Sequence, residues 1–343
     1  MKILIIADPG ILVPPEGYGG IERIIADLAT EYTKQGHEVD LLASAGSKIV
    51  GCKSYAHSYA GFPPSRQTVL KAIIYTWFFL IRKHKKYDAI HNFGRLLYLL
   101  PIKNKKIKKL QCYQREITKS NIDLILKSKT QNFFFSGCSR DLVERASPTG
   151  RWSYIHNCVV FSNYSLNSSL EIDSAPLVFL GRLDKIKGVH IAIAVAKKTN
   201  RNLIIAGNIS NSSEELEYFE KEIKPHIDDK QIIYVGEVND VQKNDILGKS
   251  AALLMPIQWN EPFGIVMIEA MACGTPVIAF PRGAVPEVVL HGETGFIVNN
   301  TETMIQAVER LKDIDREHCR NRAYEKFDVS VICNQYLTIF QNS

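Results

Sequence analysis

The chain has 343 residues, of which 45% are hydrophobic and 23% charged. This composition is typical of globular proteins and excludes collagen-like, coiled-coil and largely disordered chains, and the length predicts two domains of roughly 150–170 residues. Residues 1–160 carry 24 Lys and Arg against 12 Asp and Glu, whereas residues 161–343 carry 18 against 24. The two halves therefore face different partners, or the basic half approaches something acidic.

The first half opens on a short apolar run that predicts a strand at Ile3–Ala7. This run is too short for a signal peptide, so a cytoplasmic protein is expected. Apolar residues at helical spacing between Ile21 and Tyr32 predict a helix, and further apolar runs predict strands at Val39–Ala43, Ala89–His91 and Phe133–Phe135.

Two segments of the first half combine charge with apolar residues. Val69–Ile81 is the longest apolar stretch and includes Lys71, but it is too short to span a membrane. The basic run 82–86 follows it, and a second basic cluster covers 103–109. One interpretation is a buried helix with a solvated end, and the other is peripheral contact with an anionic membrane or a polyanionic acceptor. Nucleic acid is disfavoured because the aromatic residues do not alternate with the charges.

The second half predicts a doubly wound parallel sheet. Continuous apolar runs at 176–180, 203–206, 232–235, 251–255 and 276–280 alternate with helix-length segments, which include Val189–Lys198, Ser213–Lys224 and Ile265–Cys273. A polar, turn-rich stretch at 162–169 marks the domain boundary. An amphipathic helix at Phe327–Phe340, with no strand after it, is expected to pack back on the first domain.

Ligands of parallel α/β sheets bind beyond the carboxyl ends of the strands. There, the run 181–188 places Arg182 and Lys187 just before a helix, where cations and backbone N–H groups can hold a diphosphate. A solvated loop is the alternative interpretation.

A second motif follows the strand at 251–255. Glu261 lies in a loop, a helix is expected from about Gly264, and Glu269 lies among Ile, Met and Ala, where an unpaired carboxylate is costly. Two carboxylates at this spacing can address different hydroxyl groups of one extended ligand, and the N–H groups of Phe263, Gly264 and Ile265 can contact phosphate or sugar oxygens. Two surface charges are the alternative.

Together with Gly19-Gly20-Ile-Glu22, Gly274-Thr-Pro-Val-Ile and the run 283–296, these motifs resemble the family 4 retaining glycosyltransferases of the GT-B fold. The resemblance covers nearly all of the second half and mainly the opening of the first. It implies an α/β fold with two Rossmann-like doubly wound parallel-sheet domains facing a cleft. Residues 1–160 would bind the acceptor, 161–326 would bind the donor, and the helix 327–343 would return to the first domain.

The resemblance also implies roles for single residues. Arg182 and Lys187 would hold the donor diphosphate without a metal or other cofactor. Glu269 would bind the ribose, the backbone near Val238 would meet the base, and Glu261 with the amides of Phe263, Gly264 and Ile265 would address the sugar. Gly19 and Gly20 would let the backbone approach the phosphates.

One departure concerns the His-x-His pattern of related enzymes, which here reads His91-Asn-Phe93. His91 and Arg95 are therefore only candidates for the sugar site, and a structural role for His91 is the alternative. Asp313-Ile-Asp315 has the spacing of a metal-binding Asp-x-Asp motif, but it falls in a predicted helical stretch with Leu311 and Ile314 inward and is interpreted as a solvated face.

The resemblance implies a retaining, metal-independent hexosyltransferase of polysaccharide biosynthesis that acts in the cytoplasm or peripherally at the inner face of the membrane. The donor would be a nucleotide sugar and the acceptor a saccharide or a lipid-linked saccharide. Two alternatives remain: an epimerase or phosphorylase on the same fold, and a non-catalytic subunit that binds sugar nucleotides.

Overall fold

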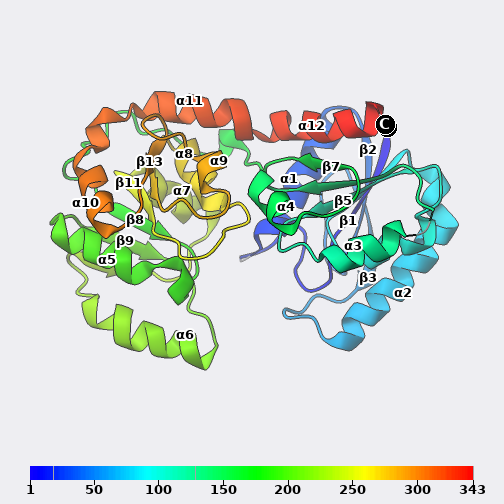
Figure 1. Cartoon of the computed structure of the whole chain (residues 1–343), viewed down its shortest axis with the longest axis horizontal. Helices are drawn as coiled ribbons and strands as arrows, with labels where there is room; N and C mark the ends of the chain where they lie inside the picture. The colour runs from blue at the N-terminus through cyan, green and yellow to red at the C-terminus, as the bar shows by residue number, and fades with distance from the viewer. Residues whose placement is uncertain (18, 128, 343) are drawn as a thin grey trace. The chain divides into compact units, whose positions relative to one another are not determined.

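The computed structural model describes residues 1–17, 19–127 and 129–342. The chain forms two units (Figure 1). Unit 1 comprises Met1–Cys158 and the chain from Val329 on, and unit 2 comprises Val159–Asp328. Each unit has its own parallel sheet and its own buried core.

Unit 1 is built on a seven-stranded sheet in the order β3-β2-β1-β4-β5-β6-β7, with every pair parallel. The strands are β1 (Lys2–Ile6), β2 (Glu38–Ser44), β3 (Lys53–Ser58), β4 (Ala89–Asn92), β5 (Lys108–Tyr113), β6 (Phe133–Gly137) and β7 (Trp152–Tyr154). The strand order reverses between β1 and β4, which is where doubly wound sheets bind ligands. The strands predicted at 3–7, 39–43, 89–91 and 133–135 are confirmed, and β3, β5 and β7 were not predicted.

The helices of unit 1 are α1 (Gly20–Lys34), α2 (Arg66–Lys83), α3 (Lys119–Leu126), α4 (Arg140–Ala146) and α12 (Val329–Asn342), and two 3-10 helices are η1 (His84–Lys86) and η2 (Leu96–Ile102). Helix α1 buries the apolar face that its sequence predicts, including Ile24, Leu28 and Tyr32. The C-terminal helix α12 packs against α1, and its Tyr336 side chain is buried.

Unit 2 repeats the same plan with six parallel strands in the order β10-β9-β8-β11-β12-β13. The strands are β8 (Leu177–Leu180), β9 (Leu203–Ala206), β10 (Ile232–Tyr234), β11 (Ala252–Met255), β12 (Val277–Ala279) and β13 (Gly295–Ile297). All five strands predicted for this half are confirmed, and β13 was not predicted. Here the order reverses between β8 and β11.

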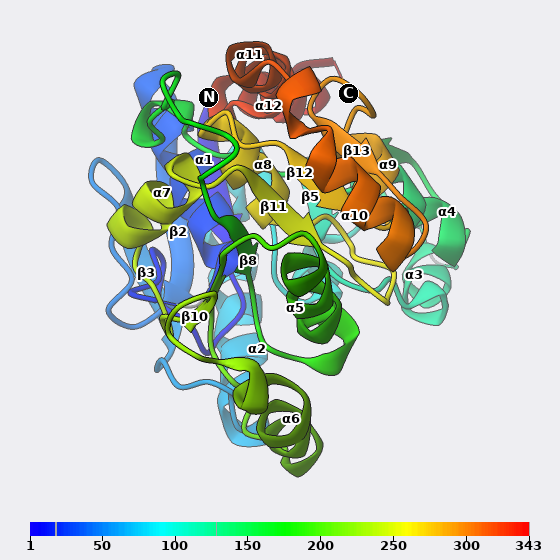
Figure 2. The ribbon, with the colours of Figure 1, turned by 90° about the vertical axis from the view of Figure 1, so that its left-hand side faces the viewer.

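Helices cover both faces of the unit 2 sheet (Figure 2). Helices α5 (Val189–Lys198) and α10 (Thr301–Glu309) pack together on one face, whereas α7 (Asp240–Gly248), α8 (Ile265–Ala272) and α11 (Arg316–Phe327) form a second group. The remaining α-helices of unit 2 are α6 (Ser213–Tyr218), which continues as a π-helix at Phe219–Ile223, and α9 (Val285–Val288).

The Asp-x-Asp motif needs one correction. Residues 311–315 are not one helical stretch, because a 3-10 turn covers Leu311–Asp313 and Asp315 is the N-cap of α11. The Asp315 carboxylate accepts a hydrogen bond from the His318 amide at 2.7 Å. Leu311 and Ile314 are buried, as expected.

Candidate active site

The predicted donor residues of unit 2 lie at the point where its strand order reverses. The loop that carries Arg182 and Lys187 follows β8, and the loop that carries Glu261 follows β11. Because β8 and β11 are paired neighbours, both loops leave the same edge of the sheet.

Close backbone contacts hold these two loops together. Gly188 has a φ of 79°, and a Cβ there would lie 2.2 Å from the Pro256 carbonyl oxygen. The Gln258 amide donates to the Ile186 carbonyl at 2.8 Å, which ties the loops to each other. A side chain at position 188 would separate them, so the glycine is required by packing as well as by its backbone conformation.

Lys187 and Glu261 form an ion pair in which Nζ lies 2.5 Å from Oε2. The Trp259 Nε1 donates to the same oxygen at 3.1 Å, and Nζ lies 5.1 Å from the centre of the Trp259 ring. The side chains of Lys187 and Glu261 are only 20% and 12% exposed. The structure thus pairs Lys187, for which the resemblance implied the donor diphosphate, with Glu261, for which it implied the sugar.

Arg182 is anchored at one side of its guanidinium. Its Nη2 lies 2.6 Å from Asp184 Oδ2, and the arginine side chain is 40% exposed while that of Asp184 is 6% exposed. Asp184 Oδ1 is buried and has no hydrogen-bond partner among the described residues. The carboxylate therefore fixes the position of a guanidinium that solvent and ligands can reach.

Glu269, the fifth residue of α8, is buried and paired. Its Oε1 forms an ion pair with Lys243 Nζ and accepts a hydrogen bond of 3.1 Å from the Tyr164 hydroxyl. Lys243 comes from α7, and its Nζ also lies 3.0 Å from Asp240 Oδ1. Burial and the nearby carboxylate raise the pKa of Tyr164 well above its ordinary value, so the phenol keeps its proton and donates.

Lys243 and Tyr164 are functional candidates that sequence reasoning missed. They lie 26 and 105 residues from Glu269 in the chain and belong to no recognisable motif. The one available signal was the cost of an unpaired carboxylate at an apolar position, which required some partner without identifying it.

Of the other predicted donor residues, four lie in unit 2 and two in unit 1. Gly264 is the N-cap of α8 with a φ of 80°, Phe263 is buried, and Ile265 begins the helix. Val238 is half-buried in the loop between β10 and α7. Gly19 and Gly20 are in unit 1, at the start of α1, and a Cβ at Gly19 would lie 2.7 Å from Pro15 Cβ.

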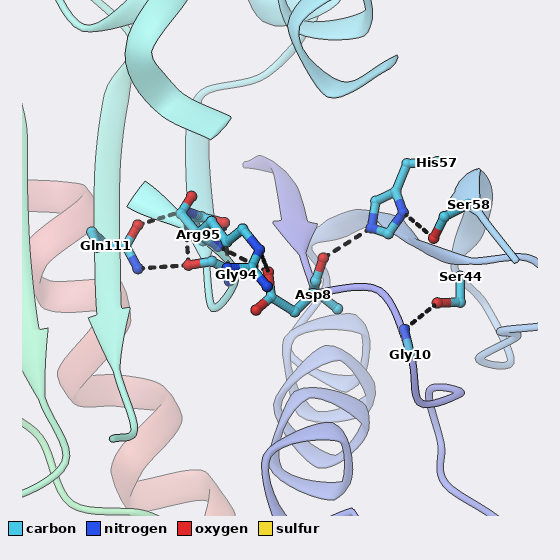
Figure 3. Close-up of polar contacts among 10 residues, drawn as sticks. Asp8, Gly10, Ser44, His57, Ser58, Gly94, Arg95 and Gln111 are labelled. Carbon is cyan, nitrogen blue, oxygen red and sulfur yellow. Dashed lines mark hydrogen bonds and ion pairs between the residues drawn. The ribbon is translucent and has the colours of Figure 1, made fainter. Parts of the chain in front are cut away.

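Unit 1 contains a cavity of about 510 Å³ at its own strand-order reversal. Its wall comes from the ends of β1, β4 and β5 and from α1, η2 and α3. Figure 3 shows Asp8, Gly94 and Arg95 meeting on this wall, with Gln111 beside them. Asp8 Oδ1 accepts from the Arg95 amide at 3.0 Å, and Gln111 Nε2 donates to the Gly94 carbonyl at 2.9 Å.

Two further polar groups line this cavity. Glu22 is buried, and burial raises the pKa of its carboxyl above the ordinary value. Gln114 has a buried side-chain nitrogen and a buried side-chain oxygen, neither of which has a hydrogen-bond partner among the described residues. Because an unsatisfied buried amide is costly, Gln114 is suited to hydrogen-bond a polar ligand.

The expectation for His91 is corrected by its burial. His91 is 0% exposed, with Nδ1 3.2 Å from the Tyr32 hydroxyl and Nε2 2.9 Å from Cys112 Sγ. Burial lowers its pKa from 6.5 to about 3, so the ring stays neutral. The rings of Tyr336 and Phe340 pack on it. His91 is a buried core residue of unit 1 and does not line the cavity, whereas Arg95 does.

Sequence comparison identifies the family. The model of the family described as Glycosyl transferases group 1 matches residues 168–326, and that of Glycosyltransferase Family 4 matches residues 18–113. The chain belongs to the family 4 glycosyltransferases, and its two Rossmann-like units are those of the GT-B fold.

Individual known proteins are also similar to this chain. An uncharacterised 41.2 kDa protein in the cps region of Klebsiella pneumoniae is 25% identical over 91% of this chain and 87% of its own. The N-acetyl-alpha-D-glucosaminyl L-malate synthase of Bacillus anthracis is 36% identical over 34% of this chain and 31% of its own. The crystal structure of Anabaena HepE in complex with UDP-glucose has the same fold, with a TM-score of 0.73, 17% identity and full coverage of both chains.

Two kinds of feature are not found among the described residues. No group of three or more His, Cys, Asp or Glu residues in the described part of the chain is arranged to hold a metal ion. No helix within residues 1–17, 19–127 and 129–342 is long and apolar enough to cross a membrane.

Proposed function

We propose that this protein transfers a hexose from a nucleotide sugar to a saccharide or lipid-linked acceptor, with retention of anomeric configuration and without a metal ion. The observation that carries the proposal is the Lys187–Glu261 ion pair, which joins the loops after β8 and β11 at the strand-order reversal; Arg182 lies in the same loop as Lys187, and the helix that carries Glu269 follows Glu261. The HepE complex with UDP-glucose supports a nucleotide-sugar donor.

The donor diphosphate lies against Arg182, Lys187 and the N-terminus of α8. A guanidinium has five N–H donors, so Arg182 can hold Asp184 and still bind a phosphate oxygen. Lys187 is held by Glu261 in the structure, and a bound diphosphate becomes its second anionic partner. The amides at the start of α8 add the positive end of the helix dipole.

Both described polar contacts of Glu269 end on Oε1, so we assign Oε2 to the ribose hydroxyls of the donor. Lys243 and Tyr164 then act as positioning residues that hold this carboxylate in place. Glu261 lies in the loop before the helix and is assigned to the transferred sugar, whose anomeric carbon gains positive charge in the transition state.

The transfer step breaks the bond between the anomeric carbon and the leaving phosphate oxygen and forms a bond from the same carbon to the acceptor oxygen. Attack on the face that the diphosphate leaves retains the configuration. The acceptor proton goes to the departing diphosphate, so no protein base is needed at this step. Arg182 and Lys187 stabilise the negative charge that develops on the leaving group.

The acceptor is assigned to the unit 1 cavity. Its volume of about 510 Å³ is in the ordinary range for small-molecule sites. Gln114 and Glu22 offer hydrogen bonds to hydroxyl groups, and Leu96, Leu97 and Leu124 give the wall an apolar part. This mixture suits a saccharide that carries an apolar group.

The test is a donor and acceptor screen. UDP-, GDP-, ADP- and TDP-hexoses are incubated with mono- and oligosaccharides or with prenyl-linked saccharides, and nucleotide release is followed with and without acceptor. Acceptor-dependent release, an unchanged anomeric coupling constant in the product and full activity in EDTA support the proposal. A rearranged sugar without acceptor indicates an epimerase, release that needs inorganic phosphate indicates a phosphorylase, and nucleotide binding without turnover indicates a binding subunit.

A further inference from the structure

Helix α2 exposes a row of large apolar side chains. Leu70, Ile74, Tyr75, Phe78 and Ile81 are each 42–57% exposed. Leu70, Ile74, Phe78 and Ile81 are spaced three to four residues apart along one face, and Tyr75 lies beside them. The other face buries residues such as Ala72 and Leu80. The sequence left a buried helix as one interpretation, but the outer half of this helix is not buried.

The same segment is uniformly basic. Residues 66–86 contain no Asp or Glu and six basic side chains, namely Arg66, Lys71, Arg82, Lys83, Lys85 and Lys86. Lys71 and Arg82 are exposed beside the apolar row. They also help to line a shallow hollow of about 520 Å³ that includes Ile74, Tyr75 and Phe78.

The second basic cluster of the sequence is in part structural. Lys108 Nζ donates to the Phe340 carbonyl at 2.7 Å, at the C-terminal end of α12. Lys109 is 0% exposed, and its Nζ donates to the carbonyls of Lys105 and Ile107 at 2.7 and 2.6 Å. The interpretation of the cluster 103–109 as a contact for an anionic partner therefore does not fit these two lysines, and α2 is the better candidate.

Contacts with other elements of unit 1 fix the position of helix α2. Its inner face packs against β3 and η2. The Trp77 Nε1 donates to the Leu97 carbonyl in η2 at 2.8 Å, and the Lys83 amine lies 4.4 Å from the ring of Tyr55 in β3. The apolar row is thus presented by a fixed helix of 18 residues, about 27 Å long.

We propose that the outer face of α2 docks on an anionic membrane, with the helix lying in the plane of the surface. The row from Leu70 to Ile81 enters the boundary between headgroups and acyl chains, and Lys71, Arg82 and the basic residues after α2 contact lipid phosphates. Charge argues against a second copy as the occupant, because a symmetric contact would bring two all-basic faces together.

This docking does not depend on the transferase activity. Leu97, which accepts the Trp77 hydrogen bond, also lines the unit 1 cavity. Helix α2 therefore contacts a residue that lines the assigned acceptor site. Docking of α2 places this site near the membrane surface, which favours lipid-linked acceptors. That link, unlike the docking itself, rests on the proposed function.

The test is sedimentation of the full chain with sucrose-loaded vesicles of phosphatidylcholine alone or mixed with phosphatidylglycerol. We expect binding that needs the anionic lipid and weakens when NaCl is raised from ~0.1 to ~0.5 M. Ile74→Glu/Phe78→Glu is expected to lower the partition coefficient at least roughly tenfold. Val50→Glu/Leu216→Glu makes the same charge change at apolar residues that are 90% and 45% exposed, and serves as the control.

The charge contribution is tested separately. Lys71→Gln/Arg82→Gln is expected to lower partitioning roughly tenfold or more, whereas Lys198→Gln/Lys230→Gln, with the same change in net charge at exposed residues of unit 2, leaves it unchanged. Equal binding to neutral vesicles, or wild-type binding by the α2 variants, would overturn the proposal. So would a dimer in sedimentation velocity that Ile74→Glu/Phe78→Glu dissociates while no vesicle binds. Matching melting curves for all variants confirm that folding is intact.

Discussion

The buried pair between Lys243 and Glu269 gives the sharpest prediction about unit 2. The lysine side chain is 10% exposed and the glutamate side chain 7%. Removing one member leaves the other charge buried without its counterion, which typically costs ~3–5 kcal/mol. Lys243→Met keeps an unbranched side chain, one heavy atom shorter, and removes the ammonium group, so the loss of the counterion dominates its effect.

The expected change is large enough to measure by calorimetry. For a unit of this size, 1 kcal/mol corresponds to roughly 2–4 °C in Tm, so Lys243→Met should lower the melting temperature of unit 2 by roughly 6–20 °C. The loss of the contact between Lys243 and the exposed Asp240 adds little, because such surface pairs are worth about 0–1 kcal/mol. Tyr164→Phe removes one hydrogen bond to a carboxylate and should cost about 1.5–3 kcal/mol.

The double variant Lys243→Met/Glu269→Gln provides the control. It removes both charges, so most of the stability lost in Lys243→Met should return. The reasoning fails if Lys243→Met has the melting temperature of the wild type. It also fails if the stability lost in the double variant equals the sum of the losses in the two single variants, because the carboxylate then does not depend on Lys243. A saturating concentration of donor should also raise the melting temperature of the wild type more than that of the double variant, because ligands stabilise the folded state by mass action.

Four further predictions concern catalysis, the acceptor site and the core. Arg182→Ala should slow transfer by roughly 10²–10³-fold in single-turnover assays, with or without EDTA; rescue by Mn²⁺ would refute the metal-free site. Glu261→Gln should lower kcat more than it raises the donor KM, while Glu269→Gln should mainly raise donor KM, and donor titrations that show the reverse would exchange the two roles. Gln114→Leu should raise acceptor KM and leave donor KM unchanged, since the acceptor is assigned to the cavity that Gln114 lines. Folding lowers the pKa of His91 from 6.5 to about 3, so between these pH values the unfolded chain binds more protons than the folded one and the free energy of unfolding falls as the pH is lowered. His91→Gln should flatten this dependence of the free energy of unfolding on pH, measured by urea titrations at several pH values. An unchanged dependence would contradict the burial effect.

Local patterns were enough to predict much of the candidate donor site. Continuous apolar runs located β8 to β12, and the rule that ligands bind beyond strand ends was enough to select the loops of Arg182 and Glu261. The start of α8 near Gly264 was also predicted from the sequence, in which Pro-Phe-Gly precedes an apolar run, and the structure makes Gly264 the N-cap. These features depend on residues close together in the chain.

The tertiary structure alone decided which distant groups meet. Lys243 and Tyr164 become partners of Glu269 because α7 and the chain before β8 pack beside α8, which no local pattern specifies. His91 looks like a strand-end ligand in sequence, yet Tyr32 and Tyr336 enclose it.

Helix α2 shows the same limit for surfaces. Its sequence determines an apolar helix with basic residues inside and after it, because side-chain type and spacing are local properties. Whether another element covers a given face depends on the whole chain, and here β3 and η2 cover one side and leave Ile74 and Phe78 exposed. Burial is a sum over distant neighbours, so the sequence determined the composition of this face and only the fold decided that it is open.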